Sequence, residues 1–220
     1  MEIDGVYEIR LNFQQLLHKT RIGKNRNGNK LIEIIGASFL ANEDYIFGEP
    51  NNEYINAEIA WYKSQSTNIY DIPYKPTPSA WKYTANKNGE INSNYGRLIF
   101  SPLFFEQYNN VKEELKRNYE TRRATMIYTR PSMWEEYRDN SKNDFICTNA
   151  VTYYNNGHYL DCVVQMRSND AVYGYKNDYA WQKFVLNKLC DELCMEPGKI
   201  IWQVQNLHVY EKHFDLVKNW

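Results

Sequence analysis

Apolar residues recur along this chain with two periods, one close to that of a helix and one close to that of a strand. Helical spacing predicts amphipathic helices, whereas short apolar or aromatic runs bounded by Gly, Asn or Pro predict strands. The predicted helices cover residues 7–19, 55–62, 104–117 and a segment that begins near Asp178. The predicted strands cover residues 31–35, which run into Gly36, and residues 124–129, 145–154, 158–166 and 200–204. Loops are predicted over 22–30 and 72–80.

Strands and helices of unequal length follow one another without regular alternation or repeats, which favours a mixed α+β fold with a mixed sheet packed with helices. The sequence Asn155-Asn156-Gly157 between two strand-like runs predicts a hairpin. Neither of the usual glycine-rich phosphate-binding motifs occurs, which disfavours a doubly wound parallel sheet. The 220 residues suffice for one core, and no linker composition divides them. A single domain over 1–220 is expected.

The charge balance excludes some partners. Lys and Arg number 26 against 27 Asp and Glu, so no overall basic field favours direct nucleic acid binding, and an anion must be met by local arginines. No apolar stretch approaches the roughly 20 residues of a membrane span, and the first residues do not resemble a signal peptide. The four cysteines lack zinc-site spacing, so thiols, no metal and a soluble cytoplasmic protein are expected.

Cys147 stands before the first hairpin strand, where it is either a buried structural thiol or a nucleophile. A thiolate is reactive at neutral pH where positive charge lowers its pKa, and Arg167 at the end of the paired strand is a candidate for that charge. Arg26, Arg122, Arg123 and Arg167 either converge on one phosphate or are solvated. By pattern alone, Glu58 is a surface charge and His208 is a packed ring.

Asp178 lies eleven residues after Arg167 and, by local pattern alone, is a candidate helix N-cap. Its carboxyl group also fits one nucleobase. Cytosine presents an acceptor at N3 and a donor at its 4-amino group, which a protonated carboxyl matches, or which a carboxylate matches when N3 is protonated. Uracil presents the opposite pattern, so an acid at this position selects cytosine and rejects uracil.

Several motifs, in order and at their separations, together resemble the thymidylate synthase family. They are Glu58 with Trp61, Trp81, Asn94-Tyr95-Gly96, Arg122-Arg123, Cys147, Arg167-Ser168 with Asp170 and Gly174, and Leu207-His208-Val209-Tyr210. The resemblance runs from about Arg26 to Tyr210, and each motif is weak without the others.

Two departures point to one branch of that family. Ile146-Cys147-Thr148 replaces the usual Pro-Cys-His, and Asp178 replaces the asparagine that reads uracil. With segments such as residues 33–39, 89–96, 128–133 and 177–183, these departures resemble the branch that hydroxymethylates deoxycytidylate in T-even bacteriophages.

The resemblance implies an enzyme that transfers a one-carbon group for modified-DNA precursor synthesis. Its expected reaction converts dCMP, 5,10-methylenetetrahydrofolate and water to 5-hydroxymethyl-dCMP and tetrahydrofolate. Cys147 would add to C6 of the base, Glu58 would transfer protons through ordered water, and Asp178 would read the cytosine. Folate is the expected co-substrate.

The resemblance also assigns binding residues. It gives Arg26, Arg167 and Ser168 to the phosphate, with Arg122 and Arg123 donated by the partner subunit of a homodimer. It gives His208 and Tyr210 to the sugar, Asp170 to the base region, and Trp81, Asp170 and Gly174 to the folate side. Other nucleotide-synthesis enzymes are possible partners, and the expected location is the cytoplasm of a bacterial host.

Four alternatives remain open at this stage. Two are enzymes of the same family, a deoxycytidylate C5-methylase and a CMP hydroxymethylase. A third is a member without turnover that binds nucleotide or a partner protein in a phage precursor-synthesis complex. The last is an α+β domain whose motif matches arise by chance.

Overall fold

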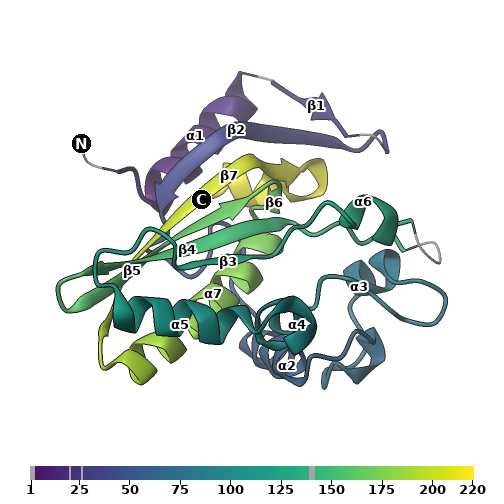
Figure 1. Ribbon diagram of the computed structural model, residues 1–220. Coiled ribbons are helices and arrows are strands. Elements are labelled where there is room, and N and C mark those ends of the chain that lie inside the picture. The colour runs from purple at the N-terminus through teal and green to yellow at the C-terminus, as the bar shows by residue number, and fades with distance from the viewer. Residues whose placement is uncertain (1–2, 20, 26, 139–141) are drawn as a thin grey trace. The chain divides into compact units, whose positions relative to one another are not determined.

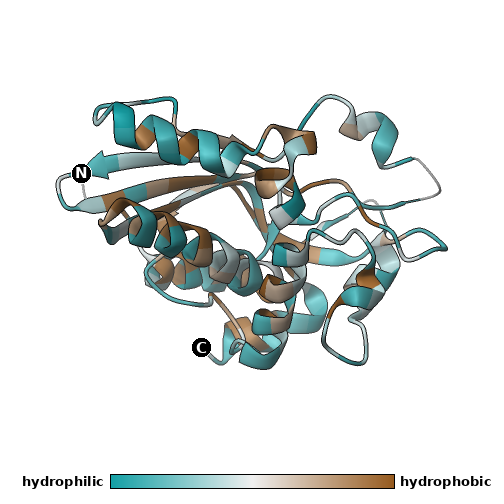
Figure 2. Ribbon diagram, turned by 60° about the horizontal axis from the view of Figure 1, so that its bottom comes forward, coloured by the Kyte–Doolittle hydropathy of each residue, from teal (hydrophilic) through white to brown (hydrophobic). Residues whose placement is uncertain are grey.

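The structure is a computed structural model that describes residues 3–19, 21–25, 27–138 and 142–220. The chain divides into two compact units. The sheet unit comprises residues 1–50 and 153–220, and the helical unit comprises residues 51–152. Hydrophobic and hydrophilic stretches alternate along the helices, as amphipathic helices require (Figure 2).

Strands of the sheet unit pair in the order β1-β2-β7-β5, and the short β6 also pairs with β7 (Figure 1). They are β1 (Gly23–Lys24), β2 (Lys30–Leu40), β5 (Tyr159–Met166), β6 (Asn169–Asp170) and β7 (Glu196–Tyr210). β2 pairs antiparallel with β7, from Leu31 opposite Tyr210 to Leu40 opposite Ile201. β5 and β6 pair parallel with β7. The sheet is therefore mixed, and the predicted α+β class is confirmed.

The predicted hairpin is present. β4 (Thr148–Asn156) is the neighbour of β5, and Gly157 between them has φ of 69°, a conformation that a residue with a side chain rarely adopts. The beginning of β4 belongs to the helical unit, where it pairs antiparallel with β3 (Thr125–Ile127), Thr152 opposite Thr125. The first hairpin strand begins three residues later than the predicted start at residue 145.

Two helices pack on the strands of the sheet unit. α1 (Val6–His18) packs against β2, and α7 (Gly174–Leu193) packs against β7 and β5. The short α8 (Phe214–Lys218) contacts α1. The core beneath α7 is aromatic, with the Tyr175 ring 5.3 Å from Trp202 and 5.9 Å from Phe39.

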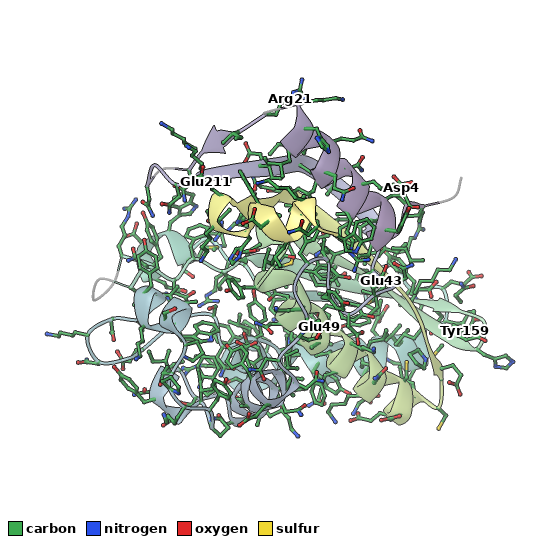
Figure 3. All side chains as sticks on the ribbon, turned by 180° about the vertical axis from the view of Figure 1, so that it is seen from behind. Asp4, Arg21, Glu43, Glu49, Tyr159 and Glu211 are labelled. Atoms are coloured by element: carbon green, nitrogen blue, oxygen red, sulfur yellow. The ribbon has the colours of Figure 1, made fainter. Side chains whose placement is uncertain are left out.

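The first turn of α7 is tied to the loop that follows β2. Tyr175 Oη donates to the carbonyl oxygen of Glu43 at 2.9 Å, and Lys176 Nζ donates to the carbonyl oxygens of Glu49 at 3.0 Å and Gly48 at 3.2 Å. Glu43 and Glu49 are labelled in Figure 3. These bonds use carbonyls that no strand partner satisfies, so they fix where α7 begins.

The helices of the helical unit are α2 (Asn52–Ser64), the 3-10 helices Ile69–Asp71 and Pro102–Phe104, α3 (Ser79–Thr84), α4 (Tyr95–Phe100), α5 (Gln107–Arg117) and α6 (Met133–Glu136). In this unit, α4 contacts α2, α5, β3 and the 3-10 helix Pro102–Phe104. The contact of α2 with α4 depends on Gly96, because a Cβ there would lie 1.9 Å from the carbonyl oxygen of Tyr62. The buried Asn94 caps α4 and donates to the carbonyls of Trp61 and Ser66.

Further boundaries differ from the predictions. α7 begins at Gly174 rather than near Asp178, and β7 spans residues 196–210 rather than 200–204. β2 continues through Gly36 to Leu40, and the loop predicted over 22–30 contains β1. Glycine, proline and polar residues suggested ends of elements, but pairing on both sides of β7 outweighs their weak local preferences. In the described part of the chain, no helix is long and apolar enough to cross a bilayer.

Candidate functional site

Glu58 of the helical unit is a buried acid held by two donors. It lies on α2 and is only 5% exposed. The hydroxyl group of Tyr54, one turn earlier, donates a hydrogen bond to Glu58 Oε1. Trp81 Nε1 donates to the same oxygen at 3.1 Å and to Tyr54 Oη at 2.8 Å. Burial raises the pKa of Glu58 to about 7, although both hydrogen bonds oppose the rise. An acid with that pKa can both give and take a proton near neutral pH.

The interpretation of Glu58 as a surface charge, which the pattern alone favoured, is wrong. Ile55, Ile59 and Tyr62 predicted the buried face of this helix, and Glu58 lies three residues after Ile55 on that same face. The helical spacing therefore contained a signal that residue type obscured. Tyr54 was missed as well, although a Tyr four residues before a buried acid is placed to bond it.

Trp81 forms a partly exposed aromatic surface beside this acid. Its ring meets Trp61 edge to face, with centroids 5.0 Å apart and planes at 73°. Trp61 is buried and donates from Nε1 to the carbonyl oxygen of Asn68 at 3.0 Å. Both indoles are thus held in fixed orientations, which suits the binding of a flat heterocycle.

Cys147 directly precedes β4, which begins at Thr148. Its neighbours Ile146 and Thr148 are almost fully buried, and the thiol itself is half-buried, with Sγ 3.9 Å from the carbonyl oxygen of Phe145. All four cysteines are thiols rather than disulfides. Two buried flanking side chains anchor the backbone here, so the thiol has a defined position.

The predicted arginines are placed differently. Arg122 and Arg123 are exposed in the segment between α5 and β3. The backbone N–H of Arg123 donates to Thr121 Oγ1 at 3.1 Å. Arg167 directly follows β5 in the sheet unit and is half-buried, as is Ser168. Arg26 lies outside the described residues.

Asp178 is the fifth residue of α7 and is not its N-cap. Its Oδ2 accepts a hydrogen bond from Asn169 Nδ2 at 2.8 Å. Asn169 Oδ1 in turn accepts from Trp202 Nε1 at 3.3 Å. A strand residue on β6 and an indole on β7 therefore hold the acid on the helix.

Gly174 makes room for this contact. A Cβ at Gly174 would lie 2.9 Å from Asn169 Nδ2 and 3.6 Å from Asp178 Oδ2. The first of these distances is shorter than real Cβ contacts, so a side chain here would displace the amide. The close approach of the Asn169 amide therefore explains why glycine stands at position 174.

Asp170 shapes the turn that leads into α7. Its Oδ1 accepts from the backbone N–H of Val172 at 2.8 Å and of Tyr173 at 3.3 Å. Asp170 is also the pairing partner of His208 where β6 meets β7. The structure thus brings Asp170, Gly174, Asp178 and His208 into one region of the sheet unit.

His208 is a buried ring near the end of β7. Burial lowers the pKa of His208, and the charge of Arg167 adds to the effect, whereas Asp170 opposes it. The imidazole is therefore neutral at pH 7. Its Nδ1 is 3.1 Å from Asn206 Oδ1, and its ring lies edge to face with Tyr210, with centroids 5.0 Å apart. A neutral imidazole and a phenol suit a hydroxyl group better than a phosphate.

Asn169 was not among the predicted site residues. Within the sequence it looks like an ordinary polar residue between Ser168 and Asp170, and its partners lie 9 and 33 positions away. No local sequence pattern predicts hydrogen bonds to residues this far away. The structure is needed to find it.

Replacing Glu58 by glutamine is expected to stabilise the protein at high pH. The pKa of Glu58 in the folded state, about 7, lies above its ordinary value of 4.5, so folding favours the protonated acid. That contribution is present below pH 4.5 and is lost as the pH rises through 7. Glu58→Gln should therefore gain about 3 kcal/mol at pH 8.5 and less than about 1 kcal/mol at pH 5.

Urea unfolding at the two pH values measures this difference. Glu120→Gln, at an exposed position of the same unit, serves as the control and should change stability equally at both pH values. A Glu58→Gln gain that does not depend on pH would contradict the assignment of a raised pKa.

Comparisons with known proteins agree with this arrangement. The model of the thymidylate synthase family matches residues 13–220. The deoxycytidylate 5-hydroxymethyltransferases of Enterobacteria phages T4 and T6 are each 48% identical over 222 residues, which cover 98% of this chain and 90% of the phage protein. The thymidylate synthase of Fusobacterium nucleatum subsp. nucleatum is 28% identical over 164 residues, which cover 72% of this chain and 56% of that protein.

The family predicted from the motifs is thus confirmed over nearly the whole length of the sequence, and not only at the residues that suggested it. The chain belongs to the thymidylate synthase family.

Proposed function

We propose that this protein hydroxymethylates C5 of dCMP. The reaction joins dCMP, 5,10-methylenetetrahydrofolate and water, and yields 5-hydroxymethyl-dCMP and tetrahydrofolate. Identity of 48% over 98% of the chain with an enzyme named for this activity supports the proposal. The observation that carries it is an acid at position 178 whose Oδ2 is bound by an amide N–H, because this acid complements cytosine rather than uracil.

Cys147 is the proposed nucleophile. Its sulfur adds to C6 of the ring, and the electron pair released to C5 makes that carbon nucleophilic. C5 then bonds to the one-carbon unit carried by the folate. Loss of the C5 proton and cleavage of the carbon–nitrogen bond to the folate release tetrahydrofolate and leave an exocyclic methylene at C5. Water adds to this methylene to form the hydroxymethyl group, and elimination of Cys147 sulfur from C6 restores the aromatic ring. The thiol is regenerated, so the protein undergoes no net change.

Glu58 is the proposed acid and base for the proton transfers. Its pKa of about 7 allows the carboxyl to exist in both forms at the pH of a cell. Tyr54 and Trp81 occupy Oε1 of the carboxyl. The exchanged proton is therefore assigned to Oε2, which we propose faces ordered water and the base.

The partly exposed indole of Trp81 suits contact with the pteridine ring of a folate. Trp81 is partly exposed, is held against Trp61 and lies next to Glu58. When bound, 5,10-methylenetetrahydrofolate supplies a carbon at the oxidation level of formaldehyde. We assign Trp81 to the folate side, together with Asp170 and Gly174.

The remaining residues are proposed to bind the phosphate and sugar. Arg167 and Ser168 bind the phosphate with Arg26, and Arg122 and Arg123 reach it from a second copy in a homodimer. The exposure of the last two arginines agrees with a role outside their own subunit. The neutral His208 and Tyr210 bind the sugar hydroxyl. We place the reaction in the cytoplasm of a bacterial host, beside other nucleotide-synthesis enzymes.

Parallel incubations with dCMP, dUMP and CMP, each with 5,10-methylenetetrahydrofolate, test this function. Mass spectrometry should find one added CH2O on dCMP and little product from dUMP or CMP, while the absorbance of dihydrofolate stays flat. A preference for dUMP would contradict the assignment of Asp178 as the residue that recognises cytosine. A methyl product with rising dihydrofolate would instead identify a methylase.

A further inference from the structure

A continuous chain of hydrogen bonds links Trp202, Asn169 and Asp178 across three elements of the sheet unit. Trp202 is completely buried on β7, and Asn169 is 3% exposed on β6. The Asn169 amide bridges Trp202 Nε1 at 3.3 Å and Asp178 Oδ2 at 2.8 Å. The backbone of Asn169 pairs with that of Leu207 on β7, which fixes the position from which the side-chain amide extends. Few other conformations are open to a side chain enclosed in this way.

The indole of Trp202 fixes the orientation of the Asn169 side-chain amide. An indole N–H can only donate a hydrogen bond, so the atom of Asn169 that faces Trp202 must be the oxygen. The Nδ2 group of Asn169 therefore faces Asp178, and it also can only donate. It follows that Asp178 Oδ2 is an acceptor at this contact and carries no proton there.

We propose that Asn169, oriented by Trp202, is a positioning residue that sets the donor and acceptor ends of Asp178 and thereby its selection of cytosine. This inference rests on the proposed function. The proton shared with N3 of the base belongs to Oδ1, whether it starts on the acid or on the ring. Oδ2, already fixed as an acceptor, receives the 4-amino group with its second lone pair.

This polarity accounts for discrimination as well as binding. With the shared proton on Oδ1, uracil would place its own N3–H against a donor and its O4 against an acceptor. If the acid could turn over, or could carry its proton on the other oxygen, both clashes would be relieved and uracil would be accepted. The amide of Asn169 removes that freedom. Gly174 protects the arrangement, since a Cβ there would lie 2.9 Å from the amide nitrogen.

Three variants test the inference. Asn169→Ala removes the donor, Asn169→Asp replaces it with an acceptor of the same size, and Trp202→Phe removes the N–H that orients the amide. The ratio of kcat/KM for dCMP to that for dUMP is the main readout. It should fall at least about tenfold in Asn169→Ala, and less in Trp202→Phe, because a buried polar contact carries discrimination of this order.

Asn169→Asp gives a second and independent readout. Two acids that face each other cannot both be ionised easily, so the pKa of Asp178 should rise. The pH profile of kcat/KM for dCMP should then shift upward by about one pH unit or more. A residue that served only the fold would lower activity at every pH and would not move the profile.

Leu160→Ala is the matched control for lost stability. Leu160 is completely buried on β5 and has no part in the proposed site. It should lower the melting temperature and leave the dCMP to dUMP ratio unchanged. For any variant that is too slow to assay, calorimetry gives the ratio of the dissociation constants of dCMP and dUMP, which reports the discrimination in ground-state binding.

The outcomes separate the two proposals. A wild-type protein that prefers dUMP would overturn the proposed function before any variant is made. A wild-type preference for dCMP that persists, with an unshifted pH profile, in Asn169→Ala and Asn169→Asp would overturn the role of Asn169 alone.

Discussion

Replacing Cys147 by serine is expected to abolish the formation of 5-hydroxymethyl-dCMP. The hydroxyl of serine is a far weaker nucleophile than a thiolate at neutral pH, so addition to C6 fails and every later step fails with it. The loss in kcat should be at least about 10⁴-fold, as is usual when a covalent nucleophile is removed. Exchange of the C5 hydrogen of dCMP with solvent reports the first step without folate transfer. It can be measured as the release of tritium from dCMP that is labelled at C5.

Cys194→Ser is the matched control for this substitution. Cys194 is an exposed thiol at the C-terminal end of α7, and its loss should leave both activities intact. Binding of dCMP to Cys147→Ser should persist, because the nucleophile contributes little to the affinity for the ground state. Hydrogen exchange at C5 that continues in Cys147→Ser would show that another group adds to the ring.

Asp178→Asn is expected to reverse the preference between nucleotides. An amide cannot transfer a proton to N3 or hold a protonated ring as a counter-ion, so C6 loses the activation that the shared proton provides, and kcat/KM for dCMP should fall about 10³-fold or more. Weak activity toward dUMP should appear, because the amide can give up the hydrogen bond from Asn169 and turn Oδ1 toward N3–H and Nδ2 toward O4. The variant should fold normally, because the new Oδ1 can still accept the hydrogen bond that Asn169 donates to Asp178.

Asp191→Asn provides the control on the same helix. Asp191 is exposed in the last turn of α7, so it reports any general effect of removing a charge from this element. It should leave the ratio of dCMP to dUMP turnover unchanged. An Asp178→Asn protein that still prefers dCMP would remove the acid from base recognition.

Much of the fold followed from local patterns. α1, α2 and the hairpin of β4 and β5 were predicted within a few residues, because their apolar spacing or turn residues act over short distances. The start of α7 was not. In the sequence, Gly174 suggests a break in a helix, whereas in the structure it is the first helical residue. Glycine is needed there because a side chain would collide with the Asn169 amide.

The sequence suggested candidate site residues but not the contacts that hold them. Cys147, Glu58 and Asp178 were singled out through the family resemblance. The partners that hold two of them were invisible in the sequence. Trp81 lies 23 positions from Glu58, and Trp202 lies 33 positions from Asn169. Such bonds depend on how distant elements meet, which periodicity does not encode.

The buried indole of Trp202 also provides a natural spectroscopic reporter. Its Nε1–H is only two hydrogen bonds from the carboxyl of Asp178, and the sequence contains six tryptophans in all. Indole N–H signals are few and well separated in nitrogen-correlated NMR spectra, and they respond to the strength of the bond they donate. Titration of the acid, or arrival of a base beside it, can therefore be followed from the interior of the nitrogen-15-enriched protein without attaching any probe.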